Sequence, residues 1–544
     1  MERSQITEHL NLITSDYRFI QILAIINYRD FCQTDIGILK ANPYETLNYN
    51  EYKFLTGLWL KNCKPVFEQG SYNYHKILDE TCGLMSALHN TYKSAFANLN
   101  RPKSYTENGE VFKEAFFYSG AGAFDSQYAK LSVDKYALDG VWLKNNKGFS
   151  PKSMNKFFNA IHTKFHNKLN DILYRRNLTN PLDLIGLFSL TYDEIVQGDI
   201  EFEAILNNIS TSYDSRIVTE LNDIGDYNPF LERPIIKLRD GRYFISVPLL
   251  VAEALYESPF YWMTKDKSYA SLSLANRGVI GETITYSILN NVFGVKNVYR
   301  GVKIFKNKSK DITDIDLLVI HKNVGLIFQV KSKKLTTLSK QGNIDSIHND
   351  FEKAIESAYL QGVTSKNSIL DAAEYGFSCD DKDIGGKIKN IKKAYIVCLV
   401  LDYFPAIVHA TQIMLYDKHS EFAIALNIPD LELICKLLKT PEKVVDYLIK
   451  RIKNCRNYYA DSELSFLGYY IKKGLNPLKK DIAFVDFTYL NYVTTLYYKS
   501  FFERKNLMEE KLDDVRNVLC LCGSGKRYVE CCSSKMGIQS DSIK

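Results

Sequence analysis

The spacing of apolar positions changes along the chain and divides it into a helical first part and a mixed second part. Residues 1–230 show mostly helical spacing, interrupted by proline and glycine. Pro234–Val247 alternates as two short strands do around an Asp240-Gly241 turn, and a helix follows. We therefore expect a mainly helical region over 1–230 and a connector made of a hairpin and a helix over 231–269.

The pattern becomes helix, strand, strand, strand, helix, strand beyond residue 270. Ile280, Ile284 and Ile288 recur every four residues and predict an amphipathic helix. The expected elements that follow are strands at Asn297–Phe305, Thr313–His321 and Leu326–Lys333, a helix at Asn343–Gln361, an inserted loop region at 363–392, and a buried strand at Lys393–Leu401. Helical patterns return over 425–510.

Length and composition indicate an ordinary globular protein of several domains. The 544 residues are 46% hydrophobic and 24% charged, values typical of soluble globular chains. The longest apolar run, Ala394–Leu401, is far shorter than the roughly 20 residues that a membrane helix needs. No signal peptide is visible at the polar start. We expect a cytoplasmic protein with no membrane span.

Positive charge is concentrated in one window. Between Ala270 and Lys340 there are twelve Lys and Arg against four Asp and Glu, whereas the net charge of the whole chain is only +6. A local basic surface favours a polyanion such as nucleic acid. Lys306, Lys308 and Lys310 are better explained as a solvated turn.

The predicted hairpin brings polar residues together. If His321 pairs with Val324, then Asp316 lies opposite Gln329; with a loop two residues longer, Asp316 lies opposite Lys331. Opposed side chains in an antiparallel pair lie about 5 Å apart at Cβ, and residues two apart share a face. Either register therefore places a carboxylate beside an amide and an ammonium group.

These residue types suit metal-assisted phosphodiester cleavage. Mg²⁺, or Mn²⁺ in its place, takes one or two carboxylates and keeps several waters, so Asp316 is the preferred ligand and Asp314 a secondary one. Glu282, at the border of the preceding helix's packed face, supplies further negative charge. Gln329 is a weaker ligand, and Lys331 is placed to orient the attacking water.

In this order, the segments resemble the PD-(D/E)xK superfamily of nucleases, specifically its Mrr-like branch, whose final motif is QxK. The matching residues are Gly278-x3-Glu282, Asp316 and Gln329-Val330-Lys331. The proline that names the superfamily is absent, as is common in this branch. The resemblance implies an αβββαβ core over 270–420, a mixed four-stranded sheet flanked by helices, within a mainly α-helical multidomain chain. It also implies Mg²⁺-dependent DNA cleavage, with Glu282 and Asp316 holding the metal and Lys331 acting in catalysis.

Four of the eleven cysteines lie within thirteen residues near the C-terminus: Cys520, Cys522, Cys531 and Cys532. The C-x-C-x8-C-C spacing can close a tetrahedral zinc site. Over 515–535 the sequence resembles the SEC-C motif, a small zinc knuckle. That resemblance implies Zn²⁺ binding and docking on a protein partner such as a chaperone or the ribosome.

The sequence thus favours a nuclease that hydrolyses DNA, and its architecture suggests bacterial defence against foreign DNA. A non-catalytic adaptor that docks through the zinc knuckle is the alternative from another class. An RNA substrate is a further alternative, because the same chemistry accepts either polymer. Sequence preference, endo or exo action and oligomeric state stay open.

Overall fold

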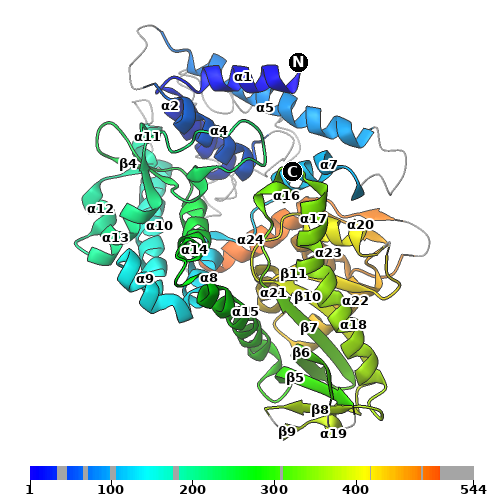
Figure 1. Ribbon diagram of the computed structural model, residues 1–544. Helices are drawn as coiled ribbons and strands as arrows, with labels where there is room; N and C mark the ends of the chain where they lie inside the picture. Colours follow the sequence, from blue (N-terminus) through cyan, green and yellow to red (C-terminus); the bar gives the residue numbers. More distant parts are fainter. Residues whose placement is uncertain are drawn as a thin grey trace.

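The computed structural model describes residues 1–32, 46–64, 71–97, 106–174, 183–306, 310–380, 382–416, 418–478 and 482–502. The chain is mainly helical and contains a four-stranded sheet, a seven-stranded sheet and a two-stranded pair. Figure 1 shows the first helices of the chain at the top of the molecule and the large sheet at the lower right, with helix α15 (Ala270–Phe293) beside the sheet.

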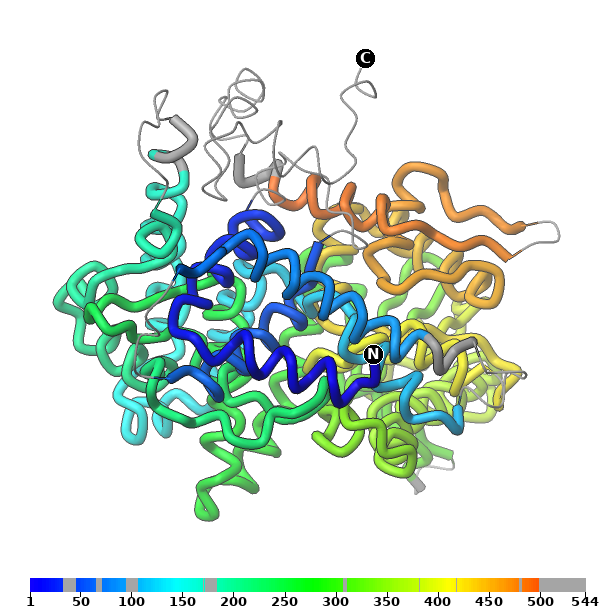
Figure 2. The backbone as a smooth tube through the Cα atoms, turned by 90° about the horizontal axis from the view of Figure 1, so that it is seen from above, coloured from blue at the N-terminus to red at the C-terminus, as the bar shows by residue number. Residues whose placement is uncertain are grey.

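The first part of the chain is a set of helices, as its spacing predicts. They are α1 (Arg3–Ile13), α2 (Phe19–Ile26), the π-helix η1 (Asn27–Cys32), α4 (Tyr49–Asn62), α5 (Tyr74–Ala97), α7 (Gly109–Tyr118), α8 (Asp125–Lys135), the 3-10 helix η2 (Ala137–Asp139), α9 (Gly140–Lys147), α10 (Pro151–Tyr174), α11 (Leu184–Leu187), α12 (Tyr192–Val196), α13 (Ile200–Ile209) and the 3-10 helix η3 (Pro229–Leu231). In the view from above, α1 and α5 lie side by side (Figure 2).

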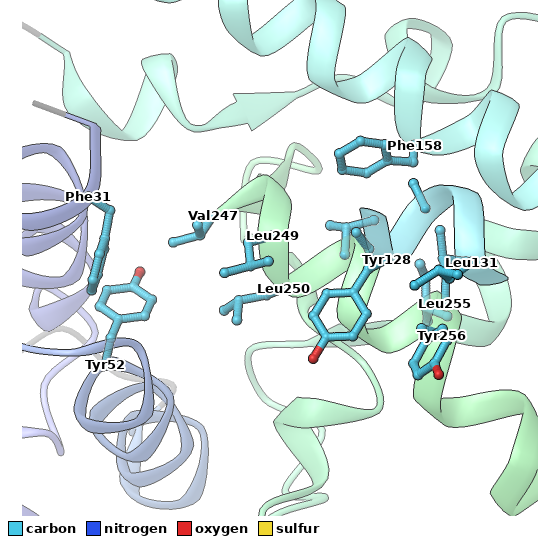
Figure 3. Packing of buried hydrophobic residues seen from close by; sticks show 14 of the residues in the cluster. Phe31, Tyr52, Tyr128, Leu131, Phe158, Val247, Leu249, Leu250, Leu255 and Tyr256 are labelled. Carbon is cyan, nitrogen blue, oxygen red and sulfur yellow. The ribbon is translucent and has the colours of Figure 1, made fainter. Parts of the chain in front are cut away.

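Large apolar side chains join these helices to α14 (Pro248–Lys265). Tyr128 and Leu131 of α8 lie close to Leu255 and Tyr256 of α14, and Phe158 of α10 packs over them (Figure 3). All five side chains are at most 2% exposed. Burial of a side chain of this size contributes roughly 1.5–3 kcal/mol, so α14 is held from several sides.

The predicted hairpin is confirmed as part of the small sheet. Strands β3 (Ile235–Lys237) and β4 (Tyr243–Ile245) pair antiparallel. Gly241 in the turn has φ 82°, a conformation that favours glycine. Two further strands, β1 (Ser189–Leu190) and β2 (Ser210–Ser212), complete the order β1-β4-β3-β2.

The large sheet contains the predicted strands at its centre. Its members are β5 (Val298–Lys306), β6 (Lys310–His321), β7 (Val324–Lys331), β8 (Gly376–Cys379), β9 (Lys382–Asp383), β10 (Lys393–Val400) and β11 (Ala423–Asn427), in the order β11-β10-β7-β6-β5-β8-β9. Helix α15 (Ala270–Phe293) covers one face, and α18 (Ser357–Leu370) covers the other (Figure 1).

The expected four-stranded sheet is too small, and the expected loop over 363–392 is wrong. That segment contains the end of α18, strands β8 and β9, and the short helix α19 (Gly385–Ile388). Strand β8 pairs antiparallel with β5, and β11 pairs parallel with β10. Strands of two to five residues are too short to show a period, and their pairing partners are distant in sequence, so the pattern gives no signal for them.

Further helices surround the large sheet. They are α16 (Thr337–Lys340), α17 (Ile344–Phe351), the π-helix η4 (Glu352–Glu356), α20 (Ile407–Met414), α21 (Ile428–Leu438), α22 (Pro441–Lys453), α23 (Glu463–Lys473) and α24 (Thr488–Phe502), with β12 (Tyr458–Tyr459) and β13 (Ala483–Phe484) forming the two-stranded pair.

One hydrophobic cluster runs from Ile6 to Val493 and includes residues of both the N-terminal helices and the large sheet. Residues before and after the expected boundaries near 230 and 270 contribute to this same cluster. Within the described ranges, no helix is long and apolar enough to cross a membrane.

Candidate active site

The β6–β7 hairpin loses its regular pairing next to the residues that carry the predicted chemistry. Pairing begins with His321 opposite Val324 and stops one residue before Asp316. Of the two registers that the sequence left open, this is the one with Asp316 opposite Gln329, and the register with Asp316 opposite Lys331 is excluded. The strands diverge at the sheet edge where β7 and its parallel neighbour β10 both end.

Side chains replace the missing backbone bonds at this divergence. The Gln329 Nε2 donates to the carbonyl oxygen of Asp314 at 2.9 Å, and the Val330 N–H donates to Asp316 Oδ2 at 2.7 Å. The Asp316 N–H donates to Gln329 Oε1 at 3.4 Å. Gln329 is completely buried, and both ends of its amide bind β6. Its main role here is to hold the separated strands, and only the second lone pair of Oε1 remains for the predicted ligand role.

The carboxyl group of Asp316 sits in a strongly perturbing environment. Burial contributes most and raises its pKa to about 6, assisted by the carboxylates of Glu282 and Asp314, while the Val330 N–H and the Lys331 ammonium lower it. The structure therefore brings all the predicted charged residues into electrostatic reach of Asp316. A titratable group shifted by burial and by specific charged neighbours is characteristic of functional sites.

Glu282 belongs to α15, which covers the face of the sheet opposite to α18. Helix α15 packs closely on β7, since a Cβ built on Gly281 would lie 3.1 Å from Val330 Cγ1. The Glu282 carboxylate is 3.2 Å from Arg300 Nε, with 32% and 34% of the two side chains exposed. Arg300, on β5, also donates to the Val279 carbonyl at 3.2 Å. Glu282 is thus held by an arginine that sequence reasoning missed.

Lys331 is held by α18. Its Nζ donates to Gln361 Oε1 at 2.9 Å, and Gln361 Nε2 donates to Asp314 Oδ1 at 2.7 Å. Sequence reasoning placed Gln361 at the end of a helix but gave it no role, because the rotation of that helix over the sheet has no signature in a single sequence.

A buried ionic network lies directly beyond Lys331. Asp402, which follows β10, accepts from Lys135 Nζ at 2.5 Å and pairs with Arg277. Arg277 also donates to the carbonyl of Ser332 at 2.6 Å. All three charged side chains are at most 4% exposed. Burial raises the pKa of Asp402, but Arg277, Lys135 and the nearby Lys334 outweigh it and hold that pKa below its usual range. The network ties α8 to the segment after β7.

Asp314 and Asp316 carry oxygen ligands of the kind that a hard divalent cation prefers. In the part of the chain that the structure describes, no three His, Cys, Asp or Glu side chains are gathered as a metal centre. Mg²⁺ needs only one or two carboxylates because it keeps several waters. Asp316 and Asp314 supply such oxygens on one strand, and Glu282 adds to the negative field that a cation would relieve.

Comparison with family models identifies a SEC-C motif at residues 516–534. The predicted SEC-C motif is therefore confirmed, and motifs of this class typically bind zinc. The motif contains Cys520, Cys522, Cys531 and Cys532, which lie outside the described residues. No curated protein and no solved structure matches the chain.

Proposed function

We propose that this chain is a metal-dependent nuclease that hydrolyses phosphodiester bonds in DNA. The observation that carries the proposal is the meeting of Asp314, Asp316 and Lys331 where β6 and β7 diverge, with the pKa of Asp316 raised to about 6. The resemblance to Mrr-like PD-(D/E)xK nucleases, which rests on the same residues, supports it. A role in defence against foreign DNA rests on architecture alone.

The proposed reaction assigns one task to each group. A water oxygen attacks phosphorus, the bond to the leaving ester oxygen breaks, and that oxygen takes up a proton. Asp316, with Glu282 nearby, would hold a divalent cation, and that cation would supply positive charge to the phosphate and lower the pKa of the attacking water. Lys331 adds a second positive charge where charge builds up on the phosphate oxygens. Gln329 bridges the two strands beside Asp316 through its hydrogen bonds to β6.

Cleavage assays with purified protein test the proposal. Plasmid, linear and single-stranded DNA and RNA are incubated with Mg²⁺ or Mn²⁺, with EDTA as the metal-free arm. Wild-type protein is expected to cleave DNA only with metal, and Asp316→Ala and Lys331→Ala are expected to lose at least about 100-fold in rate, as for loss of an electrostatic catalytic group.

Lys393→Ala is the matched control. Lys393 is an exposed lysine at the opposite end of β10, paired with Val324, so its loss is expected to leave cleavage unchanged. Cleavage that persists in Asp316→Ala, or that needs no metal, contradicts the proposal. If the protein cleaves RNA but not DNA, it is a ribonuclease rather than a deoxyribonuclease.

The SEC-C motif supports a second function, docking on a protein partner, chaperone or ribosome. This function is compatible with catalysis, because the motif at 516–534 contains none of the predicted catalytic residues. Cys531→Ser is expected to release zinc, measured by metal analysis, while metal-dependent cleavage continues. If the protein cleaves no nucleic acid and co-purifies with ribosomes through this motif, it is instead a non-catalytic adaptor.

A further inference from the structure

Helix α18 is set unusually close to the large sheet. A Cβ built on Gly362 would lie 2.5 Å from Ile396 Cγ2 of β10, so only glycine fits here without movement of the strand or helix. The π-helical turn η4 directly precedes α18. Such turns insert an extra residue and offset the following helix. Together these features place the neighbouring Gln361 at the margin of the sheet, over the end of β7.

Gln361 separates a cation from an anion. Its amide oxygen accepts from Lys331 Nζ at 2.9 Å, and its amide nitrogen donates to Asp314 Oδ1 at 2.7 Å. The amide holds both groups in place and carries no net charge. In a direct ion pair, the ammonium of Lys331 would instead be offset by the carboxylate of Asp314. An ammonium group has three donors, and the contact with Gln361 uses one.

We propose that Gln361 is a positioning residue of the candidate active site: it fixes the Lys331 ammonium and keeps Asp314 from neutralising it. This inference rests on the proposed nuclease function. The charge of Lys331 then remains available to the scissile phosphate as negative charge builds up on its oxygens. Because that charge is largest in the transition state, loss of Gln361 affects the chemical step more than substrate binding.

Two variants of similar length separate charge from packing. Gln361→Met fills the same space without hydrogen bonds, and Gln361→Glu keeps the shape but places a carboxylate against Lys331 and Asp314. Both are expected to lower kcat roughly 10- to 100-fold, the usual range for residues that orient a catalytic group. KM and the thermal midpoint are expected to stay close to wild type. Asn367→Met, at an exposed position of the same helix, is the control and should cleave normally.

Steady-state kinetics of the full chain at saturating Mg²⁺ decide the outcome. A fall in kcat at constant KM for both Gln361 variants supports the inference. Wild-type kcat in either variant, or a change confined to KM, overturns it and leaves the nuclease proposal intact. A wild-type protein that cleaves no polymer overturns the nuclease proposal, and the role of Gln361 with it.

Discussion

Asp316 is central to the proposed catalysis, and its ionised form also lowers the stability of the fold. Its carboxyl group is removed from water and lies near two other carboxylates, which raises its pKa to about 6. The folded chain therefore holds this proton more tightly than the unfolded chain, where an aspartate titrates near 3.9. At neutral pH the ionised form is disfavoured by folding, and a bound cation would remove that penalty.

Asp316→Asn is expected to stabilise the protein while abolishing cleavage. Between about pH 4 and pH 6 the folded state binds more protons, so the contribution of Asp316 to the free energy of unfolding falls as pH rises through that window. The asparagine variant avoids this loss. Its thermal midpoint should exceed that of wild type by a few degrees at pH 8 and equal it near pH 4.

Thermal scans across pH, with and without metal, measure this effect. Mg²⁺ or Mn²⁺ should raise the midpoint of wild type and leave that of Asp316→Asn unchanged, because a ligand stabilises only the form that binds it. If Asp316→Asn is less stable than wild type at pH 8, the ionised Asp316 carboxylate is not destabilised by its surroundings.

At the scale of elements, the closeness of α15 and α18 to the sheet positions the site. Two glycines of the sequence motif behave differently. Gly281 faces Val330 closely, whereas a Cβ at Gly278 would meet nothing within 4 Å. On α18, Gly362 is the more restrictive position because its added Cβ would overlap Ile396.

Gly362→Ala is expected to lower the free energy of unfolding by about 1–3 kcal/mol, the usual cost of overpacking. Gly278→Ala, the matched control, should raise it by about 0.5–1 kcal/mol because alanine favours the helix. Urea unfolding of the two variants gives both values. Gly362→Ala should also lower kcat because it displaces Gln361. Equal stability of the two variants would contradict the described packing of α18.

The sequence was sufficient to predict those elements whose hydrophobic pattern is local. The tight turn limited Asp316 to two registers, of which the structure has the one that begins with His321 opposite Val324, and the four-residue period of Ile280 and Ile284 located α15. It was insufficient to predict contacts between residues that are far apart in the sequence. Gln361 acts only through the rotation of α18, which depends on packing. Strands β8 and β11 have too few residues to show a period.

At the scale of the whole molecule, the helical part and the sheet share one core. Lys135 of α8 and Arg277 of α15 meet Asp402 at the end of β10, 267 and 125 residues away in sequence. Such contacts leave no local pattern, so they could not be predicted from the sequence. The ionic network makes the N-terminal helices part of the scaffold that holds the segment after Lys331.

Asp402→Asn is expected to lower the free energy of unfolding at pH 7 by about 3–5 kcal/mol, because it removes the carboxylate that pairs with buried Arg277 and leaves Lys135 only the more distant Glu257 at 3.9 Å. Burial raises the pKa of Asp402, but Arg277, Lys135 and Lys334 outweigh burial and hold it below that of the unfolded chain. Its contribution is therefore present above about pH 4 and is lost as pH falls further.

Chemical denaturation at pH 7 measures this loss. Lys130→Ala serves as the control. It breaks the ion pair between Lys130, whose side chain is 65% exposed, and Glu432. The free energy of unfolding is expected to change by no more than about 1 kcal/mol. If Asp402→Asn costs no more than the control, the network does not join the two parts of the molecule.

The most direct test of the central claim is DNA cleavage by wild type and Asp316→Asn, side by side at pH 8 with Mg²⁺ or EDTA. The asparagine variant is expected to be at least as stable as wild type, so its inactivity cannot be attributed to unfolding. Wild type with metal is expected to cleave DNA, and the other three arms are expected to show no cleavage. Cleavage by Asp316→Asn at the wild-type rate, or no cleavage by folded wild type with either metal on any DNA or RNA, would contradict it.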